Sequence, residues 1–266
     1  MKYFVFSDVH GFYDLLIGKL NSEGFDINNP NHMLISLGDN FDRGPQNYLV
    51  YSFLKQMKDK NKIILLRGNH EDLLLNMINT NTANYYDITN GTYQTINEFS
   101  IRYFGKFGYD LFFNGFELLY QELKNDGVLD LIYDMKDYYE TDNYVFTHGF
   151  IPVLKDDEYN PIYDEDWRKS DRKKFKEARW TNGISMSINY NIGVPNKKIV
   201  VGHWHTSYGH VRKNNNKENL KSYKELEFSS DANFNIYTDK NIIAIDACTA
   251  HTNKINVLVV EDNYEE

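Results

Sequence analysis

Short apolar runs alternate with helical apolar stripes over the first third of the chain. Each run is bounded by turn residues and predicts a buried β-strand, over 2–7, 32–37 and 62–66. Behind each run, apolar residues recur at helical spacing, over 15–20, 49–54 and 73–78. The order strand, helix, strand, helix, strand, helix predicts an α/β fold in which helices cover a mainly parallel sheet.

The rhythm changes between about 79 and 142, where turns rich in Asn and Thr give way to aromatic-rich helical patterns. These patterns lie at about 99–107, 116–123 and 129–135. We interpret the segment as a helical insertion that caps a site, and not as a separate domain. Aromatic residues at this spacing are more often core residues than substrate contacts, and both interpretations stay open.

Strand patterns return in the second half, at 144–147, 198–201, 242–247 and 254–260. Between them, residues 155–197 are predicted as a polar, irregular insertion, and about 212–231 as a loop. The basic run 168–176 follows acidic residues, which favours a solvated helix face over a landing surface for an anionic substrate. We expect one domain over 1–266.

Composition and net charge limit the classes of binding partner that we expect. The chain of 266 residues can bury a substantial core, and its formal charge of −9 argues against general affinity for nucleic acid or an anionic membrane. Cys248 is the only cysteine, which indicates a reducing compartment. With no long apolar span and no signal peptide, we expect a cytoplasmic protein. The oligomeric state is not predicted.

Polar side chains follow five of the predicted strands at the point where each strand ends. Each turn carries Asp, Asn or His, usually beside Gly, and one such turn alone is weak evidence. Ligands of α/β sheets bind outside the carboxyl ends of strands, so five turns together predict one site. The turns are Asp8-Val9-His10-Gly11, Gly38-Asp39-Asn40-Phe41-Asp42-Arg43-Gly44, Gly68-Asn69-His70-Glu71, Thr147-His148-Gly149 and Gly202-His203-Trp204-His205.

The donor types indicate divalent cations. Carboxylate, imidazole and amide oxygen or nitrogen atoms suit Mn²⁺, Fe²⁺, Zn²⁺ or Ni²⁺, and the lack of thiolates argues against a structural zinc site. Two ions about 3.5–4 Å apart would hold the attacking and leaving oxygens of an in-line displacement at phosphorus. Asp39 is the best candidate for a bridging ligand. The other candidates are Asp8 and His10 for one ion, and Asn69, His148 and His203 for the other.

The charge balance favours an anionic substrate. Two cations carry four positive charges, whereas Asp8 and Asp39 return two negative ones. The surplus would attract phosphate and lower the pKa of a bridging water, giving a hydroxide nucleophile near neutral pH.

Four charged side chains beside these ligands fit catalytic roles. Arg43 and Arg67 could bind phosphate oxygens and compensate charge in the transition state. His70 could protonate the leaving alkoxide, with Asp42 orienting its ring. The alternative for this last pair is a surface ion pair without a catalytic role.

The set of turns resembles the calcineurin-like metallophosphoesterase superfamily. Gly-Asp-x-x-Asp-Arg-Gly followed by Arg-Gly-Asn-His-Glu is similar to its phosphoprotein phosphatase branch, which includes bacterial and phage serine/threonine phosphatases and diadenosine tetraphosphate hydrolases. The resemblance spans Asp8 to His205. It implies a two-sheet β-sandwich flanked by helices, with a dinuclear site above the strand ends and the residue roles given above. We expect two divalent ions, with Mn²⁺ first and Fe, Zn or Ni as alternatives.

Two further predictions come from this resemblance. The stretch Ala178-Arg179-Trp180-Thr181-Asn182 looks like the family's Trp-containing substrate loop but lacks the basic residue that often follows the Trp. We therefore expect Trp180 to contact substrate and Arg179 to stand in for the missing cation. The sequence Gly-His-x-His is typical of other branches, in which the second His binds the first metal, so His205 is a predicted ligand.

Three functions follow from these observations. The first is a metal-dependent phosphomonoesterase resembling serine/threonine protein phosphatases, acting on a phosphorylated protein or a small phosphoester. The second is a hydrolase of dinucleoside polyphosphates or other nucleotides, with Trp180 or aromatics of the insertion stacked on a base. The third is a non-catalytic binding module, which is disfavoured because every proposed ligand and the acid His70 are present.

Overall fold

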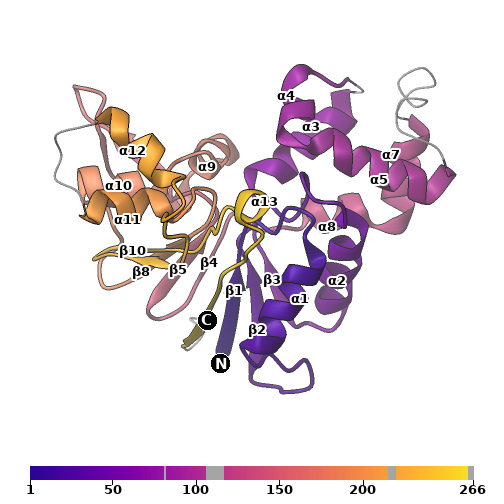
Figure 1. Cartoon of the computed structure of the whole chain (residues 1–266), viewed down its shortest axis with the longest axis horizontal. Helices are drawn as coiled ribbons and strands as arrows, with labels where there is room; N and C mark the ends of the chain where they lie inside the picture. Colours follow the sequence, from indigo (N-terminus) through magenta and orange to yellow (C-terminus); the bar gives the residue numbers. More distant parts are fainter. Residues whose placement is uncertain (81, 106–116, 215–219, 263–266) are drawn as a thin grey trace.

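Two β-sheets lie face to face and carry helices on their outer faces (Figure 1). The computed structural model describes residues 1–80, 82–105, 117–214 and 220–262. The first sheet has the order β11-β1-β2-β3, in which β1, β2 and β3 are parallel and β11 is antiparallel to β1. Its strands are β1 (Lys2–Phe6), β2 (His32–Ser36), β3 (Ile63–Leu65) and β11 (Val257–Glu261).

The second sheet has the order β4-β5-β8-β10-β9, and its three central strands are parallel. A separate hairpin pairs β6 with β7. The strands of the second sheet are β4 (Tyr138–Glu140), β5 (Tyr144–Thr147), β8 (Lys198–Val201), β9 (Tyr237–Thr238) and β10 (Ile242–Ala244). The hairpin strands are β6 (Val153–Lys155) and β7 (Pro161–Tyr163).

Helices cover the outer face of each sheet (Figure 1). The first half of the chain contains α1 (Tyr13–Ser22) and α2 (Asn47–Asp59), which lie along the first sheet, and α8 (Val128–Tyr133). The helices α3 (Asn69–Thr80), α4 (Tyr85–Asn90), α5 (Thr92–Phe104) and α7 (Glu117–Asp126) form a lobe above that sheet (Figure 1). The second half of the chain adds the 3-10 turn Trp167–Lys169 and α9 (Arg172–Arg179), α10 (Gly183–Tyr190), α11 (Ser207–Asn214), α12 (Leu220–Glu227) and α13 (Thr249–Thr252). In the described residues, no helix is both long enough and apolar enough to cross a bilayer.

Strand β1 shows why the predicted runs are continuously apolar. Its successive side chains point to opposite faces. Phe4 and Phe6 pack under the helices, whereas Tyr3 and Val5 pack between the two sheets, and all four are buried. A strand covered on both faces has no polar face. Full burial of one such side chain contributes about 1.5–3 kcal/mol. The predicted sandwich of two sheets flanked by helices is confirmed.

The structure corrects two segments of the prediction. Residues 155–197 are not irregular, since they form β7, the 3-10 turn, α9 and α10. Helix α9 was not recognised from the sequence because it is highly charged and its apolar stripe is short. Its buried apolar residues are Phe175 and Ala178, which are three residues apart. The range predicted for the helical insertion also contains β4, which pairs with β5 and buries Tyr139.

Other differences are smaller. The predicted loop at 212–231 contains the end of α11 and all of α12 in its described part. Among the predicted aromatic helical patterns, Phe107 and Phe116 lie outside the described residues.

Candidate metal centre

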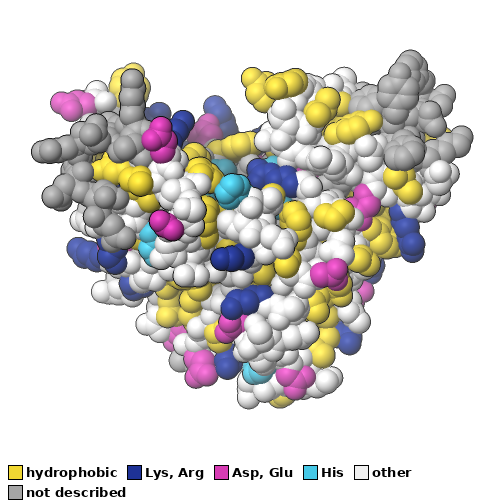
Figure 2. All heavy atoms as spheres, viewed as in Figure 1, with side chains coloured by type: hydrophobic (Ala, Val, Ile, Leu, Met, Phe, Trp, Pro, Cys, Tyr) yellow, Lys and Arg dark blue, Asp and Glu magenta, His cyan; other side chains and the backbone are white. Residues whose placement is uncertain are grey.

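The five polar turns converge at one edge of the sandwich. They follow β1, β2, β3, β5 and β8, whose parallel directions bring their carboxyl ends together. Two groups of potential ligand atoms result, and within each group all atoms lie within 4.8 Å of one another. The space-filling view shows a hollow between two lobes, with a histidine and a basic side chain near its floor (Figure 2). The groups are His10, Asp39 and His70, and Asp39, His148 and His203.

Two of the imidazoles are oriented by backbone carbonyls. Nδ1 of His10 lies 2.9 Å from the carbonyl oxygen of Phe41, and Nδ1 of His148 lies 2.9 Å from that of Leu37. Each Nδ1–H therefore donates to the backbone and leaves Nε2 facing the centre. An outer hydrogen bond of this kind fixes the tautomer of a metal-ligating histidine. Burial lowers the pKa of His10 well below its usual range, so its ring is neutral and able to bind a cation.

Asp8 and Asn69 complete the two groups. Oδ2 of Asp8 accepts hydrogen bonds from the backbone N–H of His203, at 2.9 Å, and from the Ser7 hydroxyl. The other carboxylate oxygen of Asp8 lies 3.9 Å from Nε2 of His10. Oδ1 of Asn69 lies 2.8 Å from Nε2 of His148. The predicted ligands of both ions, apart from His205, therefore border one centre that contains Asp39.

The backbone at these turns is held in an uncommon conformation. In the described part of the chain, twelve non-glycine residues have positive φ. For non-glycine residues this costs about 1–3 kcal/mol each and persists where the surrounding structure demands it, often at functional sites. Six of the twelve are predicted site residues, namely Asp8, His10, Asp39, Asp42, Arg43 and His203.

The charges at the centre are tightly balanced. Nε2 of His148 lies 3.3 Å from Oδ1 of Asp39. Burial is the largest single effect and would raise the pKa of Asp39 and lower that of His148. The surrounding charges and hydrogen bonds, led by the attraction between these two groups, together outweigh burial in both. The pKa of Asp39 falls well below its usual range, and that of His148 rises to about 9. Burial and the charge on His148 lower the pKa of His203 to about 3. A divalent cation fits here, because it would replace the proton between an imidazole and a carboxylate.

Glu71 was not among the predicted site residues, although it ends the Gly-Asn-His-Glu turn. Its fully buried carboxylate accepts hydrogen bonds from the backbone N–H groups of Asp39 (2.9 Å), Asn40 (2.8 Å) and Gly68 (2.8 Å). It therefore ties the turn after β2 to the turn after β3. Its position directly after the candidate residues Asn69 and His70 could have identified Glu71 from the sequence.

Asp246 is a second residue that the sequence analysis missed. Its buried carboxyl group follows β10, and burial together with the nearby Asp8 carboxylate raises its pKa well above the usual range. The backbone N–H of Cys248 donates to Asp246 Oδ1 at 2.6 Å. The predicted turns also place a polar side chain directly after an apolar run, so this pattern in the sequence could have identified Asp246.

His70 and Asp42 form a buried pair. Nδ1 of His70 lies 2.7 Å from Oδ2 of Asp42, and Nε2 lies 3.1 Å from Nη2 of the exposed Arg43. Burial opposes the charged imidazolium, but the carboxylates of Asp39 and Asp42 outweigh burial and raise the pKa of His70. The alternative of a surface ion pair is wrong, because His70 and Asp42 are 3% and 0% exposed.

Arg179 lies in a different environment from the one we expected. Its Nε donates to Asp72 at 2.8 Å and its Nη1 donates to Asp137 at 2.6 Å. The side chain is buried and joins α9 to the first turns of α3 and to the chain before β4. A phosphate contact would require it to leave two carboxylates, so the structure gives Arg179 a structural role.

Arg67 is also engaged by the protein. Its Nη2 donates to the backbone oxygens of Ile132, at 2.6 Å, and Tyr133, at 3.2 Å. These carbonyls belong to the last turn of α8. The guanidinium thus fastens the insertion to β3, and of the two predicted phosphate clamps only Arg43 has an exposed side chain beside His70.

The structure does not bring His205 to the metal centre. Its Nδ1 lies 2.8 Å from the Ser207 hydroxyl, and its Nε2 lies 3.4 Å from a carboxylate oxygen of Glu227 in α12. Both ring nitrogens therefore face other protein groups. The predicted role of His205 as a ligand has no support in this geometry.

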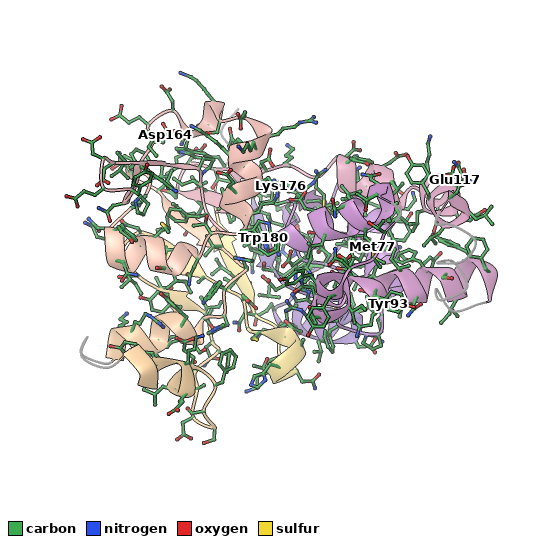
Figure 3. The ribbon with its side chains drawn as sticks, turned by 90° about the horizontal axis from the view of Figure 1, so that it is seen from above. Met77, Tyr93, Glu117, Asp164, Lys176 and Trp180 are labelled. Atoms are coloured by element: carbon green, nitrogen blue, oxygen red, sulfur yellow. The ribbon has the colours of Figure 1, made fainter. Side chains whose placement is uncertain are left out.

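Two exposed indoles flank His203. Trp180 is 46% exposed and Trp204 is 36% exposed, and their ring centres lie 6.0 Å and 5.9 Å from the His203 ring. Seen from above, Trp180 lies where the two halves of the molecule meet (Figure 3). The predicted substrate contact thus lies beside the metal centre, and Trp204 adds a second aromatic surface.

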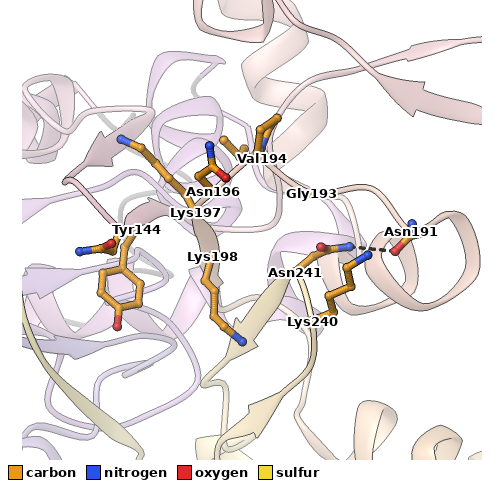
Figure 4. Close-up of a pocket in the computed structure, with 11 residues that line it drawn as sticks. Tyr144, Asn191, Gly193, Val194, Asn196, Lys197, Lys198, Lys240 and Asn241 are labelled. Carbon is orange, nitrogen blue, oxygen red and sulfur yellow. Dashed lines mark hydrogen bonds between the residues drawn. The ribbon is translucent and has the colours of Figure 1, made fainter.

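A separate cavity of about 670 Å³ lies away from this centre (Figure 4). Its lining includes Tyr144, Lys198 and Asn241, which stand at or just before the first residues of β5, β8 and β10. The cavity is therefore at the amino ends of strands whose carboxyl ends carry the polar turns. Lys198 Nζ donates to the backbone oxygen of Asp239 at 2.8 Å, so this cation is already engaged. No predicted site residue lines the cavity.

The family model described as calcineurin-like phosphoesterase matches residues 1–252. The chain is 33% identical over 87 residues to serine/threonine-protein phosphatase 2 of Salmonella typhimurium, covering 33% of this chain and 37% of that protein. It is 33% identical over 76 residues to the asymmetrical bis(5'-nucleosyl)-tetraphosphatase PrpE of Bacillus velezensis, covering 26% and 30%. The chain thus spans about a third of the length of these curated relatives.

One solved structure covers nearly the whole fold. It is described as a candidate diadenosine tetraphosphatase, and its TM-score is 0.50 at 12% identity, covering 100% of this chain and 95% of that chain. At this identity the likeness concerns the fold alone. The family model, which matches most of the chain, carries the assignment. This protein belongs to the calcineurin-like phosphoesterase family of metal-dependent hydrolases.

Proposed function

We propose that this chain is a dinuclear-metal-dependent phosphoesterase that hydrolyses phosphate monoesters, most like a serine/threonine protein phosphatase. The observation that carries the proposal is the pair of donor groups that share Asp39. We assign Mn²⁺ first, because carboxylate oxygens suit it, and keep Fe, Zn and Ni as alternatives. The proposed ligands are Asp8, His10 and Asp39 for one ion, and Asp39, Asn69, His148 and His203 for the other.

The chain's own residues have distinct tasks in this proposal. Two bound divalent cations would supply a hydroxide nucleophile near neutral pH and compensate the charge of the phosphate. Arg43 binds phosphate oxygens through its exposed guanidinium. His70 gives the proton on Nε2 to the leaving alkoxide, while Asp42 holds Nδ1 and keeps the ring oriented. The carboxylates of Asp39 and Asp42 raise the pKa of His70 against the effect of burial, which favours proton binding by this ring.

A second candidate is a hydrolase of dinucleoside polyphosphates or other nucleotides. The observation that favours it is the pair of exposed indoles, Trp180 and Trp204, whose ring centres lie 6.0 Å and 5.9 Å from the His203 ring. Aromatic rings of this size can stack on a nucleobase. The two curated relatives carry names of both classes.

The test is a panel of substrates with metal-stripped and reconstituted protein. The panel contains a phosphoserine peptide, diadenosine tetraphosphate and 4-nitrophenyl phosphate, each with Mn²⁺, Fe²⁺, Zn²⁺ or Ni²⁺. We expect about two metal ions per chain and a higher kcat/KM for the phosphopeptide than for the dinucleotide. The reverse preference would establish the second candidate. A folded protein that binds no metal, or that is loaded and cleaves none of the three, would overturn both.

We treat residues 1–266 as one catalytic domain that acts on a phosphorylated protein or a small phosphoester. The net charge of −9 supports the absence of a stable nucleic-acid partner. The single cysteine supports a reducing, cytoplasmic location.

A further inference from the structure

Helix α5 of the insertion faces the buried carboxylate that orients His70. Oγ1 of Thr92 donates to Oδ2 of Asp42 at 2.8 Å, and Oγ1 of Thr95 donates to Oδ1 of Asp42 at 2.6 Å. The two threonines are three residues apart, and this spacing places them on the same side of a helix. Two hydroxyls from one helix therefore hold both oxygens of one carboxylate.

These contacts are shielded from water. Asp42, Thr92 and Thr95 are each fully buried in the structure. A buried carboxylate is oriented by the donors around it, since water is not present to replace them. The described donors to the carboxylate of Asp42 are the two hydroxyls and Nδ1 of His70. Removing the hydroxyls would leave the ring of His70 as the main remaining constraint.

The same helix also holds the backbone of Asp42. Its N–H donates to Oγ1 of Thr95 at 3.0 Å and to Oδ1 of Asn47 at 2.8 Å. Asn47 is in turn held by Glu98 of α5, whose carboxylate accepts from the Asn47 backbone N–H at 2.7 Å and from its Nδ2 at 2.9 Å. Helix α5 thus constrains Asp42 directly and through the start of α2.

Close contact between the insertion and the turn after β2 requires Gly91. This residue precedes α5 and has a φ of +91°, a conformation that favours glycine. A Cβ atom placed there would lie 2.4 Å from the backbone nitrogen of Arg43. The first turn of α5 therefore lies directly against the chain that carries Asp42 and Arg43.

We propose that Thr92 and Thr95 are positioning residues for His70, so that the insertion helps to orient the proposed general acid. They act through Asp42, whose carboxylate they hold in the orientation that receives Nδ1–H of His70. The consequence for turnover rests on the proposed function. The consequence for the geometry of His70 does not, since it concerns a hydrogen bond of the protein itself.

The test uses the full chain with valine at one or both positions, Thr92→Val and Thr95→Val, because valine keeps the shape and removes the hydroxyl. Thr92→Ser and Thr95→Ser restore the hydroxyl without the methyl group. Thr89→Val is the matched control, since Thr89 lies exposed in the neighbouring α4 and its hydroxyl donates to backbone oxygens of that same helix. Each variant is first checked for folding by circular dichroism and for metal content by elemental analysis.

The first readout compares the loss of kcat on two substrates. For the double valine variant, we expect kcat on a phosphoserine peptide to fall about 10- to 100-fold, part of what a positioned general acid supplies. The kcat on 4-nitrophenyl phosphate should fall less than about threefold, since its leaving group needs no proton. The serine variants and Thr89→Val should match the wild type. An equal loss on both substrates, or no loss on either, would overturn the proposal.

The second readout needs no substrate. In wild-type protein at fixed pH, the Nδ1 proton of His70 should give a protected imidazole signal by ¹⁵N-edited NMR, assigned by its absence in His70→Ala. In the double valine variant its exchange with solvent should be about 10-fold faster or more. An unchanged signal would refute the positioning role. If the loaded wild-type chain cleaves no phosphoester, the proposed function fails while this readout still decides the proposal.

Discussion

Nδ1 of His70 lies 2.7 Å from Oδ2 of Asp42, which joins the first turn of α3 to the turn after β2. Neither group reaches bulk water, since His70 is 3% exposed and Asp42 is 0% exposed. The pair leaves Nε2 of His70 beside the exposed Arg43. The imidazole of His70 is thus held at Nδ1, and Nε2 is the nitrogen that remains for the proposed acid.

His70→Ala is expected to keep its metal content and to lose most turnover of substrates with poor leaving groups. Without the acid, kcat on a phosphoserine peptide should fall about 100- to 10,000-fold, and kcat on 4-nitrophenyl phosphate much less. The matched control is His210→Ala, since Nε2 of His210 contacts the backbone oxygen of Asn235. Full activity of His70→Ala on the phosphopeptide would show that the acid is another group.

Asp39→Asn should lower metal occupancy, because Asp39 is the carboxylate shared by both donor groups. An amide keeps the shape but removes the negative charge that holds two cations close together. Elemental analysis after dialysis should give about two ions per wild-type chain and fewer than one in the variant. The control is Asp59→Asn, at a side chain that is 62% exposed, and this variant should bind as much metal as the wild type. Two ions in Asp39→Asn would refute the bridging assignment.

Arg43→Ala should lower kcat and leave the free energy of unfolding nearly unchanged. The guanidinium is exposed beside Nε2 of His70, where a phosphate oxygen could reach it. Loss of one transition-state donor lowers kcat about 100- to 1,000-fold. Steady-state kinetics and thermal unfolding of the same preparation measure both effects. A wild-type kcat/KM on every substrate of the panel would exclude Arg43 as a phosphate ligand.

Arg67→Ala should show the opposite pattern. Its guanidinium donates to the carbonyls of Ile132 and Tyr133, so its removal leaves the end of α8 without a charged donor. Hydrogen bonds to charged groups contribute about 1.5–3 kcal/mol each, and we expect a loss of that order in the free energy of unfolding. Denaturant titration measures this loss. A large fall in kcat/KM with unchanged stability would restore Arg67 as a phosphate clamp.

Glu140 should make stability sensitive to acid. Burial alone would raise the pKa of this carboxyl, but hydrogen bonds to Arg168 and Lys197 outweigh burial and lower it below the ordinary 4.5. A group whose pKa is lower in the folded state stabilises the protein above its unfolded pKa. Its contribution is therefore fully present above about pH 4.5 and is lost as the pH falls through the lowered folded value.

Glu140→Gln tests this dependence, since glutamine does not titrate. The fall in unfolding free energy below pH 4.5 should be shallower in Glu140→Gln than in the wild type. Glu23→Gln is the control, because the pair between Lys19 of α1 and Glu23, the residue after that helix, is a partly exposed ion pair and contributes little. Parallel acid curves for Glu140→Gln and the wild type would disprove the prediction.

The spacing of polar turns behind apolar runs predicted which segments would meet. Asp8, Asp39 and His148 follow parallel strands, and the carboxyl ends of such strands share one edge. The same reasoning could have included Asp246, which follows β10 in the same way. It was missed because the predicted strand covered 242–247 and so contained Asp246, whereas β10 ends at Ala244.

The contacts of His205 and Arg179 could not be predicted from their neighbours in the sequence. His205 is two residues from His203, yet its ring contacts Glu227, which belongs to a helix far along the chain. Arg179 was expected at a phosphate, but Asp72 and Asp137 surround its guanidinium. In both cases the deciding partner comes from a distant segment, and local spacing carries no information about it.

The sequence by itself determined the alternation of strands and helices in the first third of the chain, the donor types and the family, because apolar runs, helical stripes and polar turn motifs are local patterns. The tertiary structure decided which donors face one another and which cations are already paired. The contact between Thr92 and Asp42, 50 residues apart, is the clearest case. A hydrogen bond between distant residues depends on how α5 packs against the turn after β2, and that packing exists only in the folded chain.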